Sequence, residues 1–131
     1  MFVDASALTS IVVGEKDADD LTERLQDFTP RITSPVALWE TTLAVARIKQ
    51  VPLDLGRREV ERFLVTLGIG VEPIDLTVAD EAIRAHALYG KGTGHKAGLN
   101  MGDCFAYACA RTNHARLLYK GDDFLHTDLG R

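Results

Sequence analysis

The sequence contains few of the residues that build disulfide frameworks or zinc sites. Two of its 131 residues are cysteine, and Cys104 and Cys109 lie five positions apart in one predicted helix. That separation points the two thiols to different faces of the helix, which disfavours a disulfide between them. We expect both to be reduced thiols of the core. The chain also lacks the H-x3-H and C-x2-C spacings that are typical of zinc sites.

Long apolar runs are missing as well. The run at residues 7–13 is broken by Thr9 and Ser10 and is far shorter than a membrane span. No basic segment precedes an apolar stretch at the start of the chain, where Asp4 stands in place of the Lys or Arg of a signal peptide. We therefore expect a cytoplasmic protein with no membrane partner.

Basic residues are outnumbered by acidic ones, with 15 Lys and Arg against 19 Asp and Glu and a formal net charge of −4. This balance excludes a polybasic protein that holds nucleic acid or anionic membrane by bulk charge. With 46% hydrophobic and 26% charged residues, the composition is that of a folded protein rather than a disordered chain. The length fits one domain over residues 1–131, because two separate cores would each be undersized.

Short apolar segments alternate with amphipathic ones along the chain. Ser34 and Pro35 predict a helix start, as N-cap and first helical residue, and Thr77 opens a capping-box pattern. The expected strands are residues 1–3, 31–33, 70–74 and 115–119, and the expected helices are residues 7–13, 17–28, 35–49, 54–67, 77–89 and 100–113. Residues 90–98 predict a glycine-rich loop, and residues 122–129 a polar turn with room for a short last strand. This alternation predicts a three-layer α/β/α sandwich with a central parallel sheet.

Acidic residues stand close to the points where the predicted strands end. Asp4 ends the first strand, Glu40 lies in the helix after the second, Asp103 opens the helix before the fourth, and Asp122 and Asp123 follow the fourth. Each alone has a structural explanation, such as a helix cap or a turn. Ligands of parallel sheets bind beyond the carboxyl ends of the strands, so we expect these carboxylates to meet there. Converging carboxylates raise one another's pKa, and a bound divalent cation, Mg²⁺ or Mn²⁺ for oxygen ligands, removes that penalty.

Five short segments carry a resemblance to a known family. They are FVDASAL at residues 2–8, WE at 39–40, LNMGDC at 99–104, LLYKGDDF at 117–124 and TD at 127–128. In order and spacing the chain resembles the PIN-domain ribonucleases, and among them the VapC-type toxins of bacterial toxin–antitoxin pairs. The resemblance covers essentially the whole chain, and the segments around Asp103 and Asp123 are its most specific parts.

The resemblance implies a parallel sheet flanked by helices, with an acidic pocket that binds Mg²⁺ or Mn²⁺. By position, Asp4, Glu40 and Asp103 match the three main carboxylates of the family. Either Asp123 or Asp122 could fill the fourth acidic position, and Asp123 is preferred because it directly precedes a phenylalanine. These five residues are the candidate metal ligands.

The activity that the resemblance implies is that of a metal-dependent endoribonuclease, the toxin of a type II toxin–antitoxin pair, which hydrolyses RNA phosphodiester bonds. Asp4 and Asp103 are then the principal metal ligands, and Glu40 and Asp123 are outer ligands or bases that orient water. These four are the candidate catalytic residues, and Ser6 matches a polar position that supports the pocket. The implied partners are a VapB-type antitoxin, an RNA substrate and a second copy of the chain in a homodimer.

An acidic pocket repels RNA, so cations around its rim must hold the backbone. The strongest candidates are Lys91, His95 and Lys96, which lie in the glycine-rich loop shortly before Asp103. The loop lacks the G-x4-G-K-[ST] pattern of a phosphate-binding P-loop. No residue of the sequence decides which RNA is cleaved, or whether one or two metal ions take part.

Two other classes of function remain open at this point. The acidic pocket could belong to a non-catalytic metal-binding or phosphoacceptor module, although Ser6 occupies the second position of the Asp-x-Asp pair that a phosphatase of this type requires. The same nuclease chemistry could act on structured DNA, which the short chain disfavours because it has no room for an added DNA clamp. Cleavage of RNA that depends on a divalent metal separates the three hypotheses.

Overall fold

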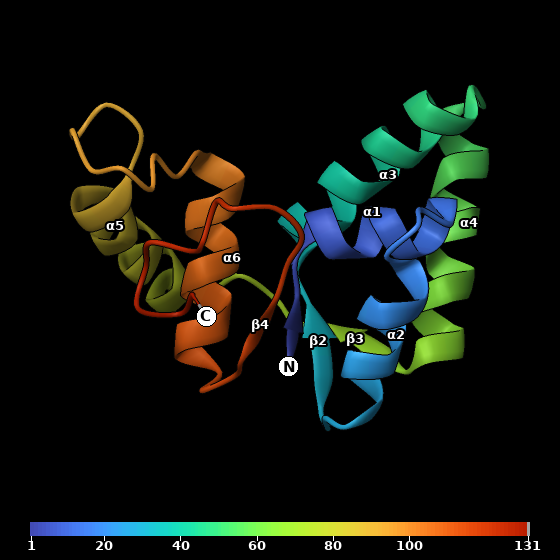
Figure 1. The fold of residues 1–131 in the computed structure, drawn as a ribbon, viewed down its shortest axis with the longest axis horizontal. Helices are drawn as coiled ribbons and strands as arrows, with labels where there is room; N and C mark the ends of the chain where they lie inside the picture. The colour runs from blue at the N-terminus through green and yellow to red at the C-terminus, as the bar shows by residue number, and fades with distance from the viewer. Residues whose placement is uncertain (131) are drawn as a thin grey trace.

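The centre of the molecule is a four-stranded parallel sheet with the strand order β3-β2-β1-β4. The computed structural model describes residues 1–130 (Figure 1). The strands are β1 (Phe2–Val3), β2 (Arg31–Thr33), β3 (Ile69–Val71) and β4 (Leu117–Leu118). Phe2 pairs with Ile32 on one side and with Leu117 on the other, so β1 is an inner strand. The predicted parallel sheet is confirmed.

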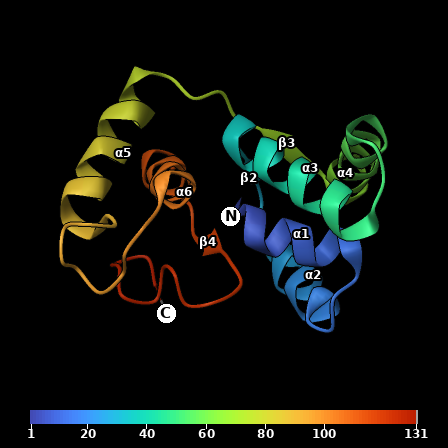
Figure 2. The ribbon, with the colours of Figure 1, turned by 90° about the horizontal axis from the view of Figure 1, so that it is seen from above.

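Helices cover both faces of this sheet (Figures 1 and 2). They are α1 (Ala5–Val13), α2 (Ala18–Gln26), α3 (Pro35–Lys49), α4 (Leu53–Leu67), α5 (Leu76–Tyr89) and α6 (Met101–Thr112). Helices α1 to α4 pack together on one side, whereas α5 and α6 pack against each other on the opposite side. The three-layer α/β/α sandwich is therefore confirmed. Within residues 1–130, no helix combines the length and the apolar character needed to cross a membrane.

Two apolar cores lie on the two faces of the sheet, because successive side chains of β1 point to opposite faces. The core beside α5 and α6 contains Phe2, Leu99, Tyr107 and Phe124. The core beside α1, α2 and α4 contains Val3, Leu8, Leu25 and Val60. Cys104 and Cys109 are buried free thiols in the first of these cores, as predicted.

Most helices begin and end within one or two residues of the predicted positions, but the expected cap of α5 is wrong. Ser34 caps α3 as predicted. Helix α5 begins at Leu76, and its N-cap is Asp75, whose Oδ1 accepts the backbone N–H of Val78 at 3.0 Å. An aspartate directly before a helical segment competes with Thr77 for the same role, and the structure places the earlier residue there.

Strand β3 also differs from the prediction, covering Ile69–Val71 rather than residues 70–74. Pro73 has no backbone N–H to donate to a neighbouring strand, so the regular ladder cannot continue through it. The N–H of Glu72 makes the last contact, donating to the carbonyl of Thr33 at 2.9 Å. The strand thus starts one residue earlier and stops before the proline.

The C-terminal part of the chain has less regular structure than expected. Strand β4 covers Leu117–Leu118 rather than residues 115–119. Residues 122–129 consist of turns and bends and contain no strand. Asp128 fastens this segment to α6 by accepting a hydrogen bond from the hydroxyl of Tyr107 at 2.6 Å. The segment after β4 is therefore held against α6 without being a sheet strand.

Candidate active site

Asp4 stands at the carboxyl end of β1 and caps α1. Its Oδ2 accepts the backbone N–H of Ser6 at 3.0 Å and the hydroxyl of Ser6 at 2.5 Å. The cap explains why α1 begins at Ala5, two residues earlier than predicted. Asp4 is only 5% exposed. Burial raises the pKa of Asp4, the bonds from Ser6 oppose this rise, and the negative charge of Asp123 adds to it.

Ser6 also links Asp4 to the segment that follows β4. Its Oγ donates to Asp4 and accepts the backbone N–H of Lys120 at 3.0 Å. A second bond between the two neighbouring strand ends runs from the N–H of Asp4 to the carbonyl of Leu118 at 2.9 Å. One serine therefore holds the first carboxylate and the start of the segment that carries Asp123.

Glu40 reaches the same place from α3. Its carboxylate lies directly over Gly102 in the first turn of α6, and a Cβ added to this glycine would come within 2.6 Å of the Glu40 carboxyl carbon. Burial raises the pKa of Glu40 to about 7, with further contributions from the charges of Asp4 and Asp103. Without a cation nearby, the carboxyl group of Glu40 therefore exchanges its proton near neutral pH.

Asp103 is held by the start of α6. Its N–H donates to Oδ1 of Asn100 at 2.8 Å, and its own Oδ2 accepts the N–H of Asn100 at 3.1 Å, which completes a capping box. Burial raises the pKa of Asp103 to about 6; the bond from Asn100 opposes the rise, and the charges of Asp123 and Asp4 add to it. A residue that caps the helix is thus also one of the converging carboxylates.

Of the two acids after β4, Asp123 is the one whose charge acts on the pocket. It contributes to the raised pKa of both Asp4 and Asp103, whereas Asp122 is not among the causes of either shift within the described chain. The backbone carbonyl of Asp122 accepts the N–H of Leu125 at 3.1 Å. This arrangement favours Asp123 over Asp122 as the fourth carboxylate.

The side chains Asp4, Glu40, Asp103 and Asp123 offer only carboxylate oxygens, which suits Mg²⁺ or Mn²⁺. Within residues 1–130, no three His, Cys, Asp or Glu side chains lie close enough to hold an ion by themselves. One oxygen of Asp4 and one of Asp103 accept hydrogen bonds from the protein. The donor set therefore fits an ion that takes one or two carboxylates and keeps several of its waters, as Mg²⁺ usually does.

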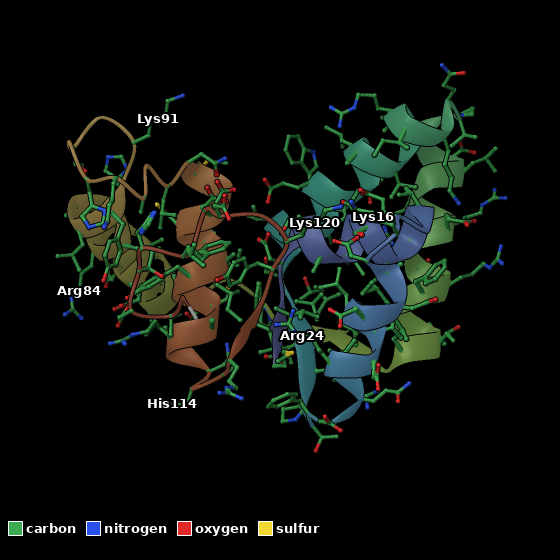
Figure 3. All side chains as sticks on the ribbon, in the orientation of Figure 1. Lys16, Arg24, Arg84, Lys91, His114 and Lys120 are labelled. Carbon is green, nitrogen blue, oxygen red and sulfur yellow. The ribbon has the colours of Figure 1, made fainter. Side chains whose placement is uncertain are left out.

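The loop of residues 90–98 follows α5 and leads to α6. The N–H of Lys91 donates to the carbonyl of Leu99 at 2.8 Å, which closes the base of the loop. Lys91 and Lys96 are exposed, and neither forms an ion pair within residues 1–130. Figure 3 shows Lys91 extending away from the ribbon. Both ammonium groups are therefore available to an anionic partner.

His95 has a structural role that the sequence did not reveal. Its Nδ1 accepts the backbone N–H of Ala97 at 3.0 Å, and its ring packs edge-on against Tyr89 with 5.0 Å between the ring centroids. One ring nitrogen is thus occupied in shaping the loop. Contact with a phosphate would have to use the other nitrogen.

Gly102 is the residue of the site that sequence reasoning missed. A side chain at this position would overlap the carboxylate of Glu40, so glycine leaves room for Glu40 to lie against the first turn of α6. The signal in the sequence was a glycine in the first turn of a helix, where it weakens the helix relative to alanine. A glycine at this place does not predict which residue packs against it, here Glu40 of α3.

Removing one carboxylate should stabilise the protein at pH 8 when metal is absent. The folded-state pKa of Glu40 is raised, so its stabilising protonated form is present at low pH and is lost as the pH rises through about 7. In EDTA, we expect Glu40→Gln to raise the free energy of unfolding by about 1 kcal/mol at pH 8, allowing for screening by solvent, and to match the wild type near pH 4. Urea denaturation at both pH values measures the difference.

The matched control for this measurement is Asp19→Asn, which removes an exposed carboxylate from α2. It should follow the wild type at pH 8 within about 0.5 kcal/mol. A Glu40→Gln variant that is less stable than the wild type at pH 8 would contradict the raised pKa of Glu40.

Comparison with protein families and with known proteins agrees with this geometry. The family model of the PIN domain matches residues 1–129. VapC ribonuclease R02377 of Rhizobium meliloti is 37% identical over 98% of this chain and 99% of its own length. Ribonuclease VapC42 of Mycobacterium tuberculosis is 39% identical over 98% of this chain and 96% of its own length.

Two solved structures share the fold. A toxin–antitoxin complex from Klebsiella pneumoniae superposes with a TM-score of 0.70 at 16% identity, covering 99% of this chain and 94% of the other. VapC20 of Mycobacterium tuberculosis, described as a sarcin–ricin loop cleaving toxin, superposes with a TM-score of 0.72 at 17% identity, covering 97% and 94%. The fold, the family model and the near full-length relatives agree: the chain belongs to the PIN-domain family and, within it, to the VapC ribonucleases.

Proposed function

We propose that this protein is a Mg²⁺- or Mn²⁺-dependent endoribonuclease, a single PIN-like nuclease domain over residues 1–131 that acts as the toxin of a type II toxin–antitoxin system. The observation that carries the proposal is the convergence of carboxylates from separate elements at one edge of the sheet: the pKa values of Asp4, Glu40 and Asp103 are raised by burial and by one another's charges, and the charge of Asp123 adds to the rise at Asp4 and Asp103. Relatives that match nearly the whole chain are named ribonucleases, which supports RNA as the substrate rather than DNA.

In this proposal Asp4 and Asp103 are the principal ligands of the cation, and Glu40 and Asp123 complete the pocket. Asp122 is the alternative to Asp123. A bound divalent ion supplies an activated water, neutralises charge on the phosphate and assists the leaving oxygen. Ser6 keeps the Asp4 carboxylate in a single orientation, because it donates to it from both its backbone N–H and its hydroxyl.

Glu40 is the candidate base that takes a proton from water. A general base must lie within reach of the water that it activates, and Glu40 lies near both Asp4 and Asp103, the proposed principal ligands. Its carboxylate lies against Gly102, in the same helical turn as Asp103. The free oxygen of Asp103 is available either to the cation or to a water molecule.

The exposed ammonium groups of Lys91 and Lys96 are the proposed contacts to the RNA backbone, with His95 as a third contact. The loop that carries them leads directly into α6 and Asp103, so an RNA strand bound to the loop would pass the acidic pocket. RNA selectivity then comes from the shape of a short unpaired segment, because a small cationic rim cannot read a long sequence.

We further propose a VapB-type antitoxin as the protein partner, a homodimer as the toxin assembly and the cytoplasm as the location. The Klebsiella neighbour is a toxin–antitoxin complex, which supports an antitoxin partner. Leu21 and Leu25 of α2 and Val60 and Leu64 of α4 are buried in this protein's own core, so these faces do not serve as a docking groove. Exposed apolar residues are found between α3 and the start of α4, where Trp39 is 59% exposed beside Leu43 and Leu53 in a groove of about 680 Å³.

The first test is cleavage of total cellular RNA by the purified protein with Mn²⁺. We expect EDTA to abolish cleavage and Asp4→Asn to lower the initial rate below about 1% of the wild type, because the buried carboxylate is a principal ligand. Asp19→Asn, on the far helix α2, should cleave at the wild-type rate. Cleavage that persists in EDTA and in Asp4→Asn would rule out the acidic pocket as the catalytic site.

The same assay separates Asp123 from Asp122. Asp123→Asn should lose most activity while Asp122→Asn keeps most of it, since only the former acts on the pocket. The reverse result would assign the fourth position to Asp122. A protein that binds metal without cleaving RNA would be a non-catalytic module, and preferential cleavage of structured DNA would change the substrate class.

The loop cations should affect RNA binding more than the chemical step. We expect the double variant Lys91→Ala, Lys96→Ala to bind a labelled single-stranded RNA more weakly and to reduce the slope of log Kd against log salt by about 1.4, at roughly 0.7 per phosphate contact. Binding is measured in the Asp4→Asn background to prevent cleavage. Arg84→Ala removes an exposed cation, which lies 3.8 Å from Glu81, from α5 (Figure 3), and an effect as large as that of the loop variant would contradict the assignment.

A further inference from the structure

Lys120, the second residue after β4, is bound by its side chain to the connection between α1 and α2. Its Nζ lies 2.6 Å from Oε2 of Glu15 and 3.3 Å from Oδ1 of Asp17. The same Asp17 oxygen accepts the hydroxyl of Ser10 at 2.5 Å. The ammonium group is therefore held by two carboxylates, one of which is itself fixed by a buried serine.

The backbone of Lys120 is fixed as well. Its N–H donates to Oγ of Ser6, the hydroxyl that holds Asp4. Gly121 follows with φ +91°, a backbone conformation that favours glycine and turns the chain toward the acids. The residue thus binds α1 through its main chain and the connection between α1 and α2 through its side chain, at the point where the chain changes direction.

Asp123 lies between two residues that are fixed by their contacts, Lys120 before it and Phe124 after it. Phe124 is buried in the core beside α6, and its ring packs edge-on against Tyr119 with 5.2 Å between centroids. The segment itself consists of turns and bends, without a helical or strand ladder to fix Asp123. The position of Asp123 therefore depends on the polar contacts of Lys120 and on the apolar contacts of Phe124.

We propose that Lys120 is a positioning residue of the metal pocket: its contacts with Glu15 and Asp17 fix the start of the segment that places Asp123 beside Asp4 and Asp103. The inference rests on the proposed function, since it concerns cation binding at those carboxylates. Lys120 acts through Asp123 and does not touch the reacting groups.

Two explanations for an effect of Lys120 predict opposite changes in cation affinity when the residue is removed. If the residue acted only through its charge, its removal would strengthen cation binding, because a positive charge near the pocket would be lost. If it acts by positioning, its removal weakens cation binding, because Asp123 is no longer held in place. Changes to residues that orient metal ligands cost about 10- to 100-fold in metal affinity or activity.

The experiment is calorimetric titration of the whole protein with Mn²⁺ in the absence of RNA, with Asp4→Asn defining the background. We expect Lys120→Met to bind Mn²⁺ about tenfold more weakly than the wild type, and Lys120→Arg to recover most of the affinity. Lys49→Met is the matched control, because Lys49 has the same 34% side-chain exposure and pairs with Glu59 at 2.8 Å. It should bind Mn²⁺ as the wild type does.

Unchanged or tighter binding in Lys120→Met, or an equal loss in Lys49→Met, would overturn the positioning role while leaving the proposed function in place. A wild type that binds no Mn²⁺ above the Asp4→Asn background would overturn the proposed metal site itself, and the inference with it. If Lys120→Met does not fold, Ser10→Ala carries the test. It loosens Asp17 without changing any charge, and it should weaken Mn²⁺ binding; unchanged affinity would again overturn the inference.

Discussion

The repulsion between carboxylates that share a buried edge of the sheet is the constraint on which the site depends. Asp4 is nearly inaccessible to solvent, and Glu40 and Asp103 have pKa values raised to about 7 and about 6. Repulsion between these ionised carboxylates destabilises the folded protein in the metal-free state. A divalent cation bound among these carboxylates would offset their repulsion, because its positive charge favours their ionised forms.

The fold resists this repulsion by fixing two of the acids through local hydrogen bonds. Asp4 is held as a helix cap by Ser6, and Asp103 is held in the capping box with Asn100. Glu40 lies against Gly102, where a side chain would crowd its carboxylate. Asp123 lies in a segment of turns and bends, so its position depends on the contacts of Lys120 and Phe124. Preorganisation of this kind is what a site that must bind an ion and a phosphate together requires.

Much of this could be predicted from the sequence, because the acids follow the strand pattern and parallel strands end at one edge of the sheet. Asp4 and Asp103 sit at helix starts whose signals are local, so their placement follows from neighbouring residues. The cap of α5 was misassigned because Asp75 and Thr77 both suit an N-cap, and local propensity does not choose between them.

Contacts between residues far apart in the chain could not be predicted from the sequence. The fit of Glu40 over Gly102 joins residues far apart in sequence, and the pairing of Lys120 with Glu15 spans almost the whole chain. The sequence predicts His95 as an RNA contact of the loop. In the structure its Nδ1 accepts a backbone N–H two residues later, a hydrogen bond that depends on the shape of the loop. The choice between Asp122 and Asp123 likewise needs the path of a segment that has no periodic pattern.

The most direct test of the shared pocket is to locate bound Mn²⁺ by the broadening it causes in the amide signals of the ¹⁵N-labelled protein. The account predicts that substoichiometric Mn²⁺ first broadens the amides of Ala5, Gly102 and Asp123, which belong to three elements that meet only at this edge. Asp4→Asn should remove the effect. Broadening centred on the exposed acids of α2, Asp19 and Asp20, with these three amides unaffected, would contradict the claim that the converging carboxylates form one cation site.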